Sequence, residues 1–225
     1  MLEIKDLHKT FNIGTINEKV ALNGVDLNLD PGDFVTIIGG NGAGKSTTLN
    51  AIAGVWPIDQ GKIIVDGEDV TRLSEHKRAV YLGRVFQDPM IGTAATMSIE
   101  ENMAIAARRG ERRGFRWGIS RKEREFYKEQ LKELDLGLEE RLTTKVGLLS
   151  GGQGQAITLL MASLKKPKLL LLDEHTAALD PKTAAKVLEI SDKIIQEHHL
   201  TAMMVTHNMK DAIAHGNRLI MMHEG

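Results

Sequence analysis

The chain has 225 residues, with 29 Lys or Arg against 30 Asp or Glu, so its formal net charge of −1 argues against a protein that holds nucleic acid by bulk positive charge. The absence of cysteine excludes disulfides, thiolate metal sites and a cysteine nucleophile. No apolar run approaches the roughly 20 residues of a membrane-spanning helix, and the N-terminal MLEIKDLHKT lacks the apolar core of a signal peptide, so we expect a soluble, intracellular globular protein.

The N-terminal third of the sequence predicts strands and one helix. The first 30 residues alternate between short apolar and polar stretches, which is typical of strands joined by turns. The run FVTII at residues 34–38 predicts a buried strand that ends in a glycine cluster, and a helix should begin near Lys45. Residues 62–65, closed by Asp66 and Gly67, predict part of a hairpin.

The glycine cluster reads GGNGAGKS, which matches the pattern G-x-x-x-x-G-K-[ST]. Glycines let the backbone curl so that successive N–H groups point at phosphate oxygens, at the positive end of a helix dipole. Lys45 can then reach the β- and γ-phosphates of a nucleotide, and the Ser46 hydroxyl can ligate Mg²⁺. The alternative is a glycine-rich turn that only caps a helix. We favour a phosphate loop formed by Gly39, Asn41, Gly42, Ala43, Gly44, Lys45, Ser46 and Thr47.

The pattern changes to charged helices between residues 90 and 149, and it then returns to strands that alternate with helices. Helices are expected at residues 151–164 and 181–198, and strands at LLLLD, TAMMVT and NRLIMM with a short helix before the last. This order predicts an α/β fold: a P-loop NTPase core with a mostly parallel sheet, an N-terminal antiparallel β subdomain and an inserted α-helical subdomain. We expect one domain over residues 1–225, with the core at 1–89 and 165–225 and the helical insertion at 90–164.

The apolar strand LLLLD ends in two carboxylates, Asp173 and Glu174. Ligands of an open parallel sheet bind at the carboxyl ends of its strands. Asp173 is therefore expected beside the phosphate loop, where it can hold Mg²⁺, and Glu174 is placed to orient or deprotonate the attacking water. The alternative, two acids on a solvated loop, loses weight once the phosphate loop is present.

The segment LSGGQ stands at the start of the helix that leads into this strand. Ser150 and Gln153 match a capping box, so the alternative to a binding role is that this segment only begins the helix. A capping box does not need two intervening glycines, which weaken a helix by about 1 kcal/mol each relative to alanine. Unobstructed N–H groups at a helix start form a second phosphate-binding surface, so we expect two phosphate sites that face each other across a dimer.

Six motifs in this order carry a family resemblance: the phosphate loop, Gln87 in VFQDP, LSGGQ, LLLLDE, Asp180 in AALD and His207 in VTHN. Over nearly its whole length the chain resembles the nucleotide-binding subunits of ATP-binding cassette (ABC) transporters. The segment DEHTAALDPKTAAKVLEI most resembles bacterial importer cassettes of aromatic amino-acid (tryptophan/tyrosine-type) uptake systems.

The resemblance implies a role for each matching residue. Gln87 would contact Mg²⁺ and the attacking water, His207 would hydrogen-bond the γ-phosphate, and Phe11 would stack on adenine unless it is a core residue of the first sheet. Ser150, Gly152 and Gln153 would bind the γ-phosphate held by the opposite subunit, and Asp180 would cross the dimer interface. The expected catalytic residues are Glu174, His207, Gln87 and Lys45, and the expected Mg²⁺ ligands are Ser46, Gln87 and Asp173.

Two positions depart from the family pattern, and one segment is strongly basic. His175 stands where proline is common, and Gly154 stands where a long polar residue follows LSGGQ. The segment 108–124 carries eight basic residues and two acids, with Phe115 and Trp117 among them. It either touches lipid headgroups and permease loops or forms a solvated face.

The sequence thus predicts an ATP-binding and ATP-hydrolysing subunit that uses ATP and Mg²⁺ to power a separate membrane permease. The expected form is a homodimer on the cytoplasmic face of the membrane, with permease subunits and an extracytoplasmic solute-binding protein as partners and no nucleic acid. The best match is a bacterial importer of amino acids or similar solutes. The alternatives are an ABC-type ATPase that acts on DNA or the ribosome and a P-loop small-molecule kinase.

Overall fold

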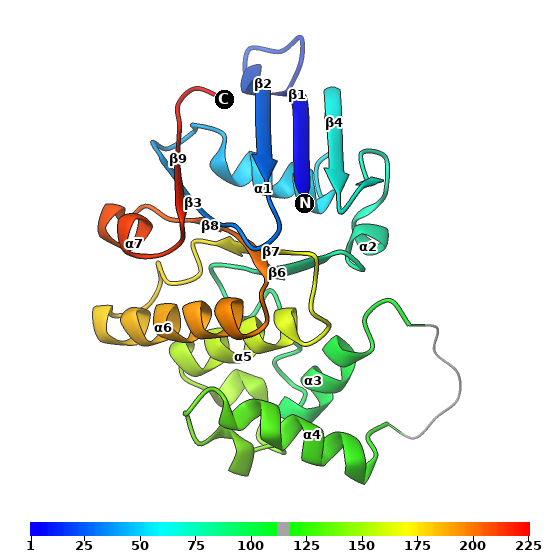
Figure 1. Cartoon of the computed structure of the whole chain (residues 1–225), viewed down its shortest axis with the longest axis vertical. Helices are drawn as coiled ribbons and strands as arrows, with labels where there is room; N and C mark the ends of the chain where they lie inside the picture. Colours follow the sequence, from blue (N-terminus) through cyan, green and yellow to red (C-terminus); the bar gives the residue numbers. More distant parts are fainter. Residues whose placement is uncertain (112–117) are drawn as a thin grey trace. The chain divides into compact units, whose positions relative to one another are not determined.

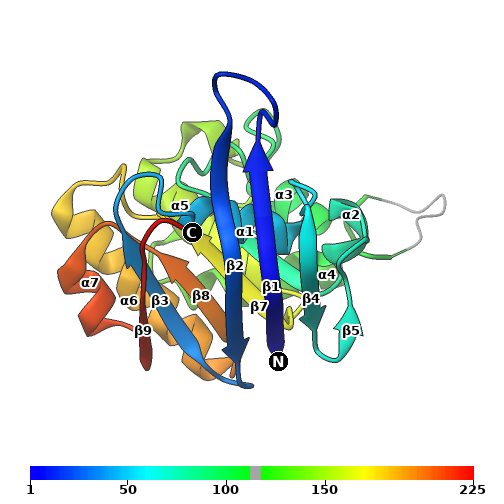
Figure 2. The ribbon, with the colours of Figure 1, turned by 90° about the horizontal axis from the view of Figure 1, so that it is seen from above.

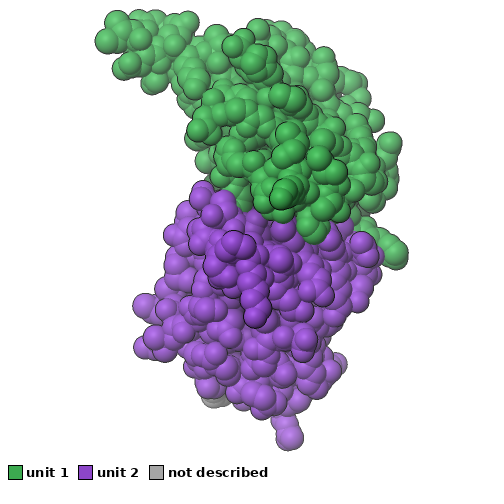
Figure 3. Space-filling view, turned by 90° about the vertical axis from the view of Figure 1, so that its left-hand side faces the viewer, with its two compact units in different colours: residues 1–83, 168–174, 199–225 green, residues 84–167, 175–198 purple. Residues whose placement is uncertain are grey.

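The structure is a computed structural model, which describes residues 1–111 and 118–225. The chain forms two compact units, which Figure 3 colours separately. Unit 1 comprises residues 1–83, 168–174 and 199–225, and unit 2 comprises residues 84–167 and 175–198. The expected division, with residues 90–164 as the helical insertion, differs from these units at residues 84–89, 165–167 and 175–198 and stays a prediction.

Unit 1 contains an antiparallel sheet in the order β2-β1-β4-β5, whose strands lie side by side in Figure 2. It also carries a second sheet in the order β6-β7-β8-β3-β9, in which β7, β8, β3 and β9 pair in parallel. The boundary between the units falls within β6, the edge strand. The strands are β1 (Leu2–Phe11), β2 (Lys19–Leu29), β3 (Phe34–Gly39), β4 (Gln60–Val65), β5 (Glu68–Asp69), β6 (Leu82–Val85), β7 (Leu169–Asp173), β8 (Thr201–Val205) and β9 (Arg218–Met222).

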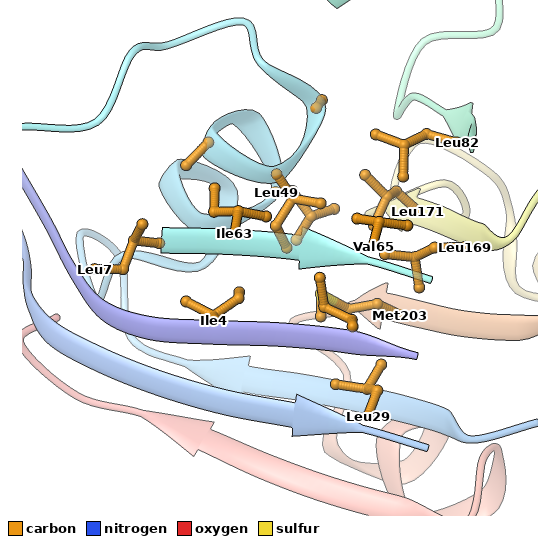
Figure 4. Packing of buried hydrophobic residues seen from close by; sticks show 14 of the residues in the cluster. Ile4, Leu7, Leu29, Leu49, Ile63, Val65, Leu82, Leu169, Leu171 and Met203 are labelled. Carbon is orange, nitrogen blue, oxygen red and sulfur yellow. The ribbon is translucent and has the colours of Figure 1, made fainter. Parts of the chain in front are cut away.

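The helix α1 joins the two sheets of unit 1 through its apolar side chains. It contacts β2 of the antiparallel sheet and also β3 and β7 of the parallel sheet. Leu49 of α1 has no solvent exposure and points among Ile63, Leu171 and their neighbours in Figure 4. Burial on all sides explains why β7 reads as an unbroken apolar run instead of an alternating one. The helices of unit 1 are α1 (Lys45–Ala53), α2 (Glu75–Arg78) and α7 (Met209–Ala214).

Unit 2 is helical (Figure 1). Its α-helices begin at side-chain caps. Ser98, Ser120 and Ser150 each cap a helix with a Glu or Gln three residues later, in a complete capping box. Asp180 caps the next helix, with Pro181 at its first position. The helices are α3 (Ile99–Ala107), α4 (Arg121–Lys132), α5 (Gly151–Ser163) and α6 (Pro181–Glu197), with 3₁₀ turns η1 (Leu138–Glu140) and η2 (Val146–Leu148).

The architecture confirms the predicted fold class: a parallel sheet with helices, an N-terminal antiparallel sheet and a helical part. In the described part of the chain, no helix combines the length and the apolar character that crossing a bilayer requires.

Candidate functional site

The phosphate loop leaves the carboxyl end of β3 and turns into α1. Gly42 and Gly44 have φ angles of 80° and 97°, a left-handed backbone that favours glycine. Lys45 is 5% exposed, and its ammonium group donates to the carbonyl oxygens of Gly39 and Gly40 at 2.8 and 3.0 Å. The loop therefore curls around a buried cation at the start of a helix, which is an anion-binding geometry.

The acidic pair lies at the same edge of the sheet as this loop. In the parallel ladder, Asp173 is in register with Val205, and Val205 is in register with Ile37, two residues before Gly39. The predicted placement of the carboxylates at the carboxyl ends of the strands therefore holds within unit 1. Ser46 and Asp173 supply the hard oxygen atoms that Mg²⁺ prefers.

Glu174 has a backbone conformation that is unusual for a residue other than glycine. Its φ of 49° is in the left-handed region, which costs a non-glycine residue free energy and is common at functional sites. Its N–H donates to the Val205 carbonyl at 3.0 Å, which fixes the strand end. The Glu174 side chain is 17% exposed, and its Oε1 lies 2.6 Å from His207 Nε2.

This contact places the two predicted catalytic side chains within hydrogen-bonding distance of each other. His207 follows β8, and its side chain is 46% exposed, so the pair opens towards solvent at the edge of the sheet. A carboxylate and an imidazole that meet here can share a proton or hold a water between them when they separate. The sequence placed both residues after neighbouring strands but did not predict that they touch.

Phe11 lies at the end of β1 and is half-buried, so it does not belong to the core of the first sheet. Its ring packs edge-on against Trp56 with the ring centroids 5.0 Å apart. Lys19 of β2 is opposite Phe11 of β1. A Cβ atom at position 42 would lie 2.8 Å from Lys19 Nζ, so this ammonium group lies next to Gly42 of the phosphate loop. The sequence alone carries no signal for Lys19, because the strand register brings this cation to the phosphate loop.

The helix α5 of unit 2 begins with the capping box that the sequence offered as the alternative to a phosphate-binding role. Ser150 Oγ accepts from the Gln153 N–H, and Gln153 Oε1 accepts from the Ser150 N–H, both at 3.3 Å. The glycines have a separate cause. A Cβ on Gly152 would lie 2.2 Å from Thr183 Cγ2, and one on Gly154 would lie 3.3 Å from Pro89 Cβ. Close packing against Thr183 therefore demands glycine at position 152, and at Gly154 it leaves a Cβ atom little room beside Pro89.

Within unit 2, Asp180 and Gln87 lie close in sequence to the two residues that pack on the start of α5. Asp180 precedes Thr183 by three residues, and Gln87 precedes Pro89 by two. Asp180 Oδ1 accepts from the Thr183 N–H at 3.1 Å, and hydrogen bonds from Thr183 lower the pKa of Asp180 below its usual value. The same Thr183 covers Gly152, so Asp180 and the signature turn are neighbours. Gln87 is exposed and follows β6, two residues before Pro89.

Part of the basic segment is held by ion pairs and hydrogen bonds within unit 2. Arg108 pairs with Glu123 at 2.7 Å, and Arg124 pairs with Glu100 at 2.6 Å. Arg109 donates to the Ala162 carbonyl. These contacts favour a structural role for Arg108, Arg109 and Arg124. Arg112, Arg113, Phe115, Arg116 and Trp117 lie outside the described residues.

Comparisons with known proteins agree with this geometry. A family model described as "ABC transporter" matches residues 22–177. A tyrosine transport ATP-binding protein of Clostridioides difficile is 44% identical over all of this chain and 89% of its own length. The spermidine/putrescine import ATP-binding protein PotA of Haemophilus influenzae is 33% identical over all of this chain, which spans only 56% of that relative.

Solved structures show the same fold. The ATP-binding cassette MJ0796, in a dimeric post-hydrolysis state bound to ADP and Pi, superposes with a TM-score of 0.83 at 31% identity, covering 100% of this chain and 95% of that one. The cassette CbiO1 from Clostridium perfringens, part of an ABC transporter complex, gives 0.82 at 25% identity, covering 100% of this chain and 85% of that one.

Proposed function

This chain belongs to the ABC transporter family of ATP-binding proteins, and on that premise we propose that it is the ATP-hydrolysing subunit of a bacterial amino-acid importer. Members of this family bind ATP and couple its hydrolysis to transport. The observation that carries the proposal is the ladder register of Asp173, Val205 and Ile37, which brings the acidic pair to the phosphate loop.

In the proposed reaction, the phosphate loop and Lys45 hold the β- and γ-phosphates of ATP. Glu174 accepts a proton from a water molecule, whose oxygen attacks the γ-phosphorus, and the bond from that phosphorus to the bridging oxygen of ADP breaks. His207 lies at the Glu174 carboxylate, so it can donate a hydrogen bond to a γ-phosphate oxygen next to the attacking water. Gln87 contributes its amide to the same water.

Mg²⁺ would be held by the Ser46 hydroxyl, the Asp173 carboxylate and the Gln87 amide oxygen, all hard donors suited to it. When bound, it neutralises charge on the phosphate oxygens. Among the described residues, no cluster of three His, Asp or Glu side chains forms a protein-only metal cage. A Mg²⁺ site in which phosphate oxygens and water molecules supply the remaining ligands is consistent with that observation.

The functional unit in this proposal is a homodimer with two composite sites. Each site combines the phosphate loop and Phe11 of one subunit with Ser150, Gly152 and Gln153 of the other, and Asp180 crosses the interface. The dimeric solved cassette supports this arrangement. ATP bridges the subunits and stabilises the closed dimer, and loss of the γ-phosphate reopens it, which is a population shift driven by differential binding.

The partners follow from the names of the relatives. A tyrosine transport protein shares 44% of residues with this chain, and this supports an aromatic or similar amino acid as the transported solute. The chain would lie on the cytoplasmic face of the membrane, bound to separate permease subunits that receive solute from an extracytoplasmic binding protein. The relatives named above are transport proteins, so neither the DNA or ribosome alternative nor the kinase alternative gains support.

Steady-state ATP hydrolysis by the purified protein with Mg²⁺ tests the chemistry. The Glu174→Gln variant should hydrolyse ATP at least about 100-fold more slowly, because it removes the proton acceptor. Glu189→Gln, which alters an exposed acid paired with Lys186 on α6, is the matched control and should keep full activity. Transfer of the γ-phosphate to a small molecule instead of water, or equal activity of Glu174→Gln, would overturn the proposal.

Uptake of radiolabelled tyrosine tests the solute. Cells that lack the gene should lose uptake, and the wild-type gene should restore it where the Glu174→Gln gene does not. Unchanged tyrosine uptake in the deletion strain would exclude this solute and leave the ATPase assignment intact.

A further inference from the structure

The buried amide of Gln155 ties three segments of unit 2 together. Gln155 lies on α5, two residues beyond the signature turn, and has no solvent exposure. Its Nε2 donates to the carbonyl oxygens of Phe86 at 2.8 Å, Gln87 at 3.1 Å and His175 at 2.6 Å. One side chain thus holds the backbone of the Gln87 loop and the residue that directly follows Glu174.

The orientation of this amide is fixed by its surroundings. All three carbonyl oxygens can only accept, so the group that faces them must be the NH₂. Its Oε1 accepts from the Thr158 hydroxyl at 2.9 Å, one turn further along α5. Every polar atom of the side chain is therefore used, and a shorter, apolar or acidic replacement leaves buried carbonyl groups without a donor.

The His175 end of the connection is anchored as well. His175 is 1% exposed, and its Nε2 lies 3.0 Å from Ser191 Oγ on α6. Ser191 Oγ donates to the Val187 carbonyl within that helix. Gln155 therefore connects a segment that α6 holds in place to the backbone of residues 86–87, where the Gln87 side chain is exposed.

We propose that Gln155 is a positioning residue that makes the signature turn and the Gln87 loop move as one body. Ser150, Gly152 and Gln153 occupy the start of α5, and Gln155 extends from the next turn to the Gln87 backbone. A displacement of α5 by phosphate at its start is thereby passed to Gln87 without any contact between the two groups. This inference rests on the proposed function, because it needs Gln87 to act on the attacking water.

A double-mutant cycle on ATP turnover tests the coupling. Gln155→Met keeps the volume and removes the donors, so kcat should fall between about 10- and 100-fold because Gln87 is misplaced. The KM for ATP should change less than about twofold, since the phosphate loop and its lysine are untouched. In a Gln87→Ala background, the same replacement should lower kcat by less than about twofold further.

Ser163→Ala is the matched control on the same helix. Ser163 is 2% exposed, and its hydroxyl donates to the Leu160 carbonyl of α5, so its loss removes a contact within that helix. Its kcat should match the wild type even where its melting temperature falls. If Gln155→Met does not fold, Gln155→Asn, whose amide is one methylene too short to span three carbonyls, takes its place in the cycle.

The outcomes separate the two claims. Losses of kcat that multiply in the double mutant, or a Gln155→Met enzyme as fast as the wild type, overturn the positioning role alone. A purified wild type that does not hydrolyse ATP overturns the proposed function and this inference together.

Discussion

Two glycine-rich helix starts in this chain carry the same sequence signal for different physical reasons. In the phosphate loop, Gly42 and Gly44 need glycine because their backbone is left-handed. At the start of α5, Gly152 is helical, and it needs glycine because Thr183 packs against its Cα atom. Glycine before a helix therefore indicates conformational freedom in the first case and close approach of a neighbour in the second.

The two starts also differ in what caps them. Gly44 caps α1 with no side-chain hydrogen bond, so the N–H groups of that turn remain for a phosphate. Ser150 caps α5 within a complete capping box, so its side chains already serve the helix. If the start of α5 binds phosphate, the same residues must also cap the helix, and these two roles can be tested separately.

Ser150→Asp separates the two roles and has the largest expected effect. Aspartate caps helices as well as serine, so the free energy of unfolding should stay within about 0.5 kcal/mol of the wild type. Its carboxylate repels the γ-phosphate of the opposite subunit, so ATP turnover should fall about 1,000-fold. Calorimetry and steady-state kinetics measure both quantities. If Ser150→Asp kept its ATP turnover, the start of α5 would serve only as a helix cap.

Gly44→Ala tests the conformational cause at the first start. Its φ of 97° is strained for alanine, and the new Cβ would lie 2.7 Å from the Ala21 carbonyl oxygen, which is backbone. We expect a loss of about 2–3 kcal/mol in the free energy of unfolding by denaturant. Because backbone causes the clash, truncating the nearby Leu22 side chain to alanine should not restore stability. Recovery in that double variant would contradict the conformational explanation.

Gly152→Ala tests the packing cause at the second start. The new Cβ would meet the Thr183 methyl group, so unfolding free energy should fall by about 1–2 kcal/mol. Thr183→Ser removes that methyl group while the Asp180 cap, which uses the Thr183 backbone N–H, is kept. The double variant should recover most of the loss in denaturant unfolding. An equal loss in the single and double variants would contradict the packing explanation.

The smallest effect concerns how the caps respond to acid. At α4, hydrogen bonds from the Ser120 N–H and hydroxyl, and then from Arg108, lower the pKa of Glu123 from 4.5 to about 2. The folded pKa is below the unfolded one, so this cap contributes fully above about pH 4.5 and loses its contribution as pH falls towards 2. The Gln153 cap of α5 does not titrate.

Amide hydrogen exchange in the first turns of α4 and α5 checks this difference. Between pH 5 and pH 3, corrected protection should fall in α4 and stay constant in α5. Gln153→Glu should transfer the acid sensitivity to α5. Equal losses in both helices of the wild type would show that the caps do not govern these turns.

Most elements were predictable because their signals are local. The apolar run predicted β7, and the phosphate-loop pattern predicted the turn into α1, each from a short stretch of sequence. The helix α2 and the strand β6 were missed, since four residues each of mixed polarity carry no periodicity.

The candidate site was predictable residue by residue but not as a geometry. The sequence indicated Glu174 and His207 from their places after strands. Their 2.6 Å contact and the left-handed backbone of Glu174 depend on the register of β7 with β8, which is a tertiary property. Gln155 escaped selection for the same reason, because a glutamine inside a helix shows no partner until the fold brings three carbonyl groups to it.

The central claim is that each ATP lies between the phosphate loop of one subunit and the signature turn of the other. Mixing two inactive variants, Lys45→Ala and Ser150→Asp, tests it most directly. A mixed dimer contains one composite site with both halves intact, so ATP turnover should reappear on mixing and peak near equal amounts. A mixture no more active than the separate variants would contradict the claim.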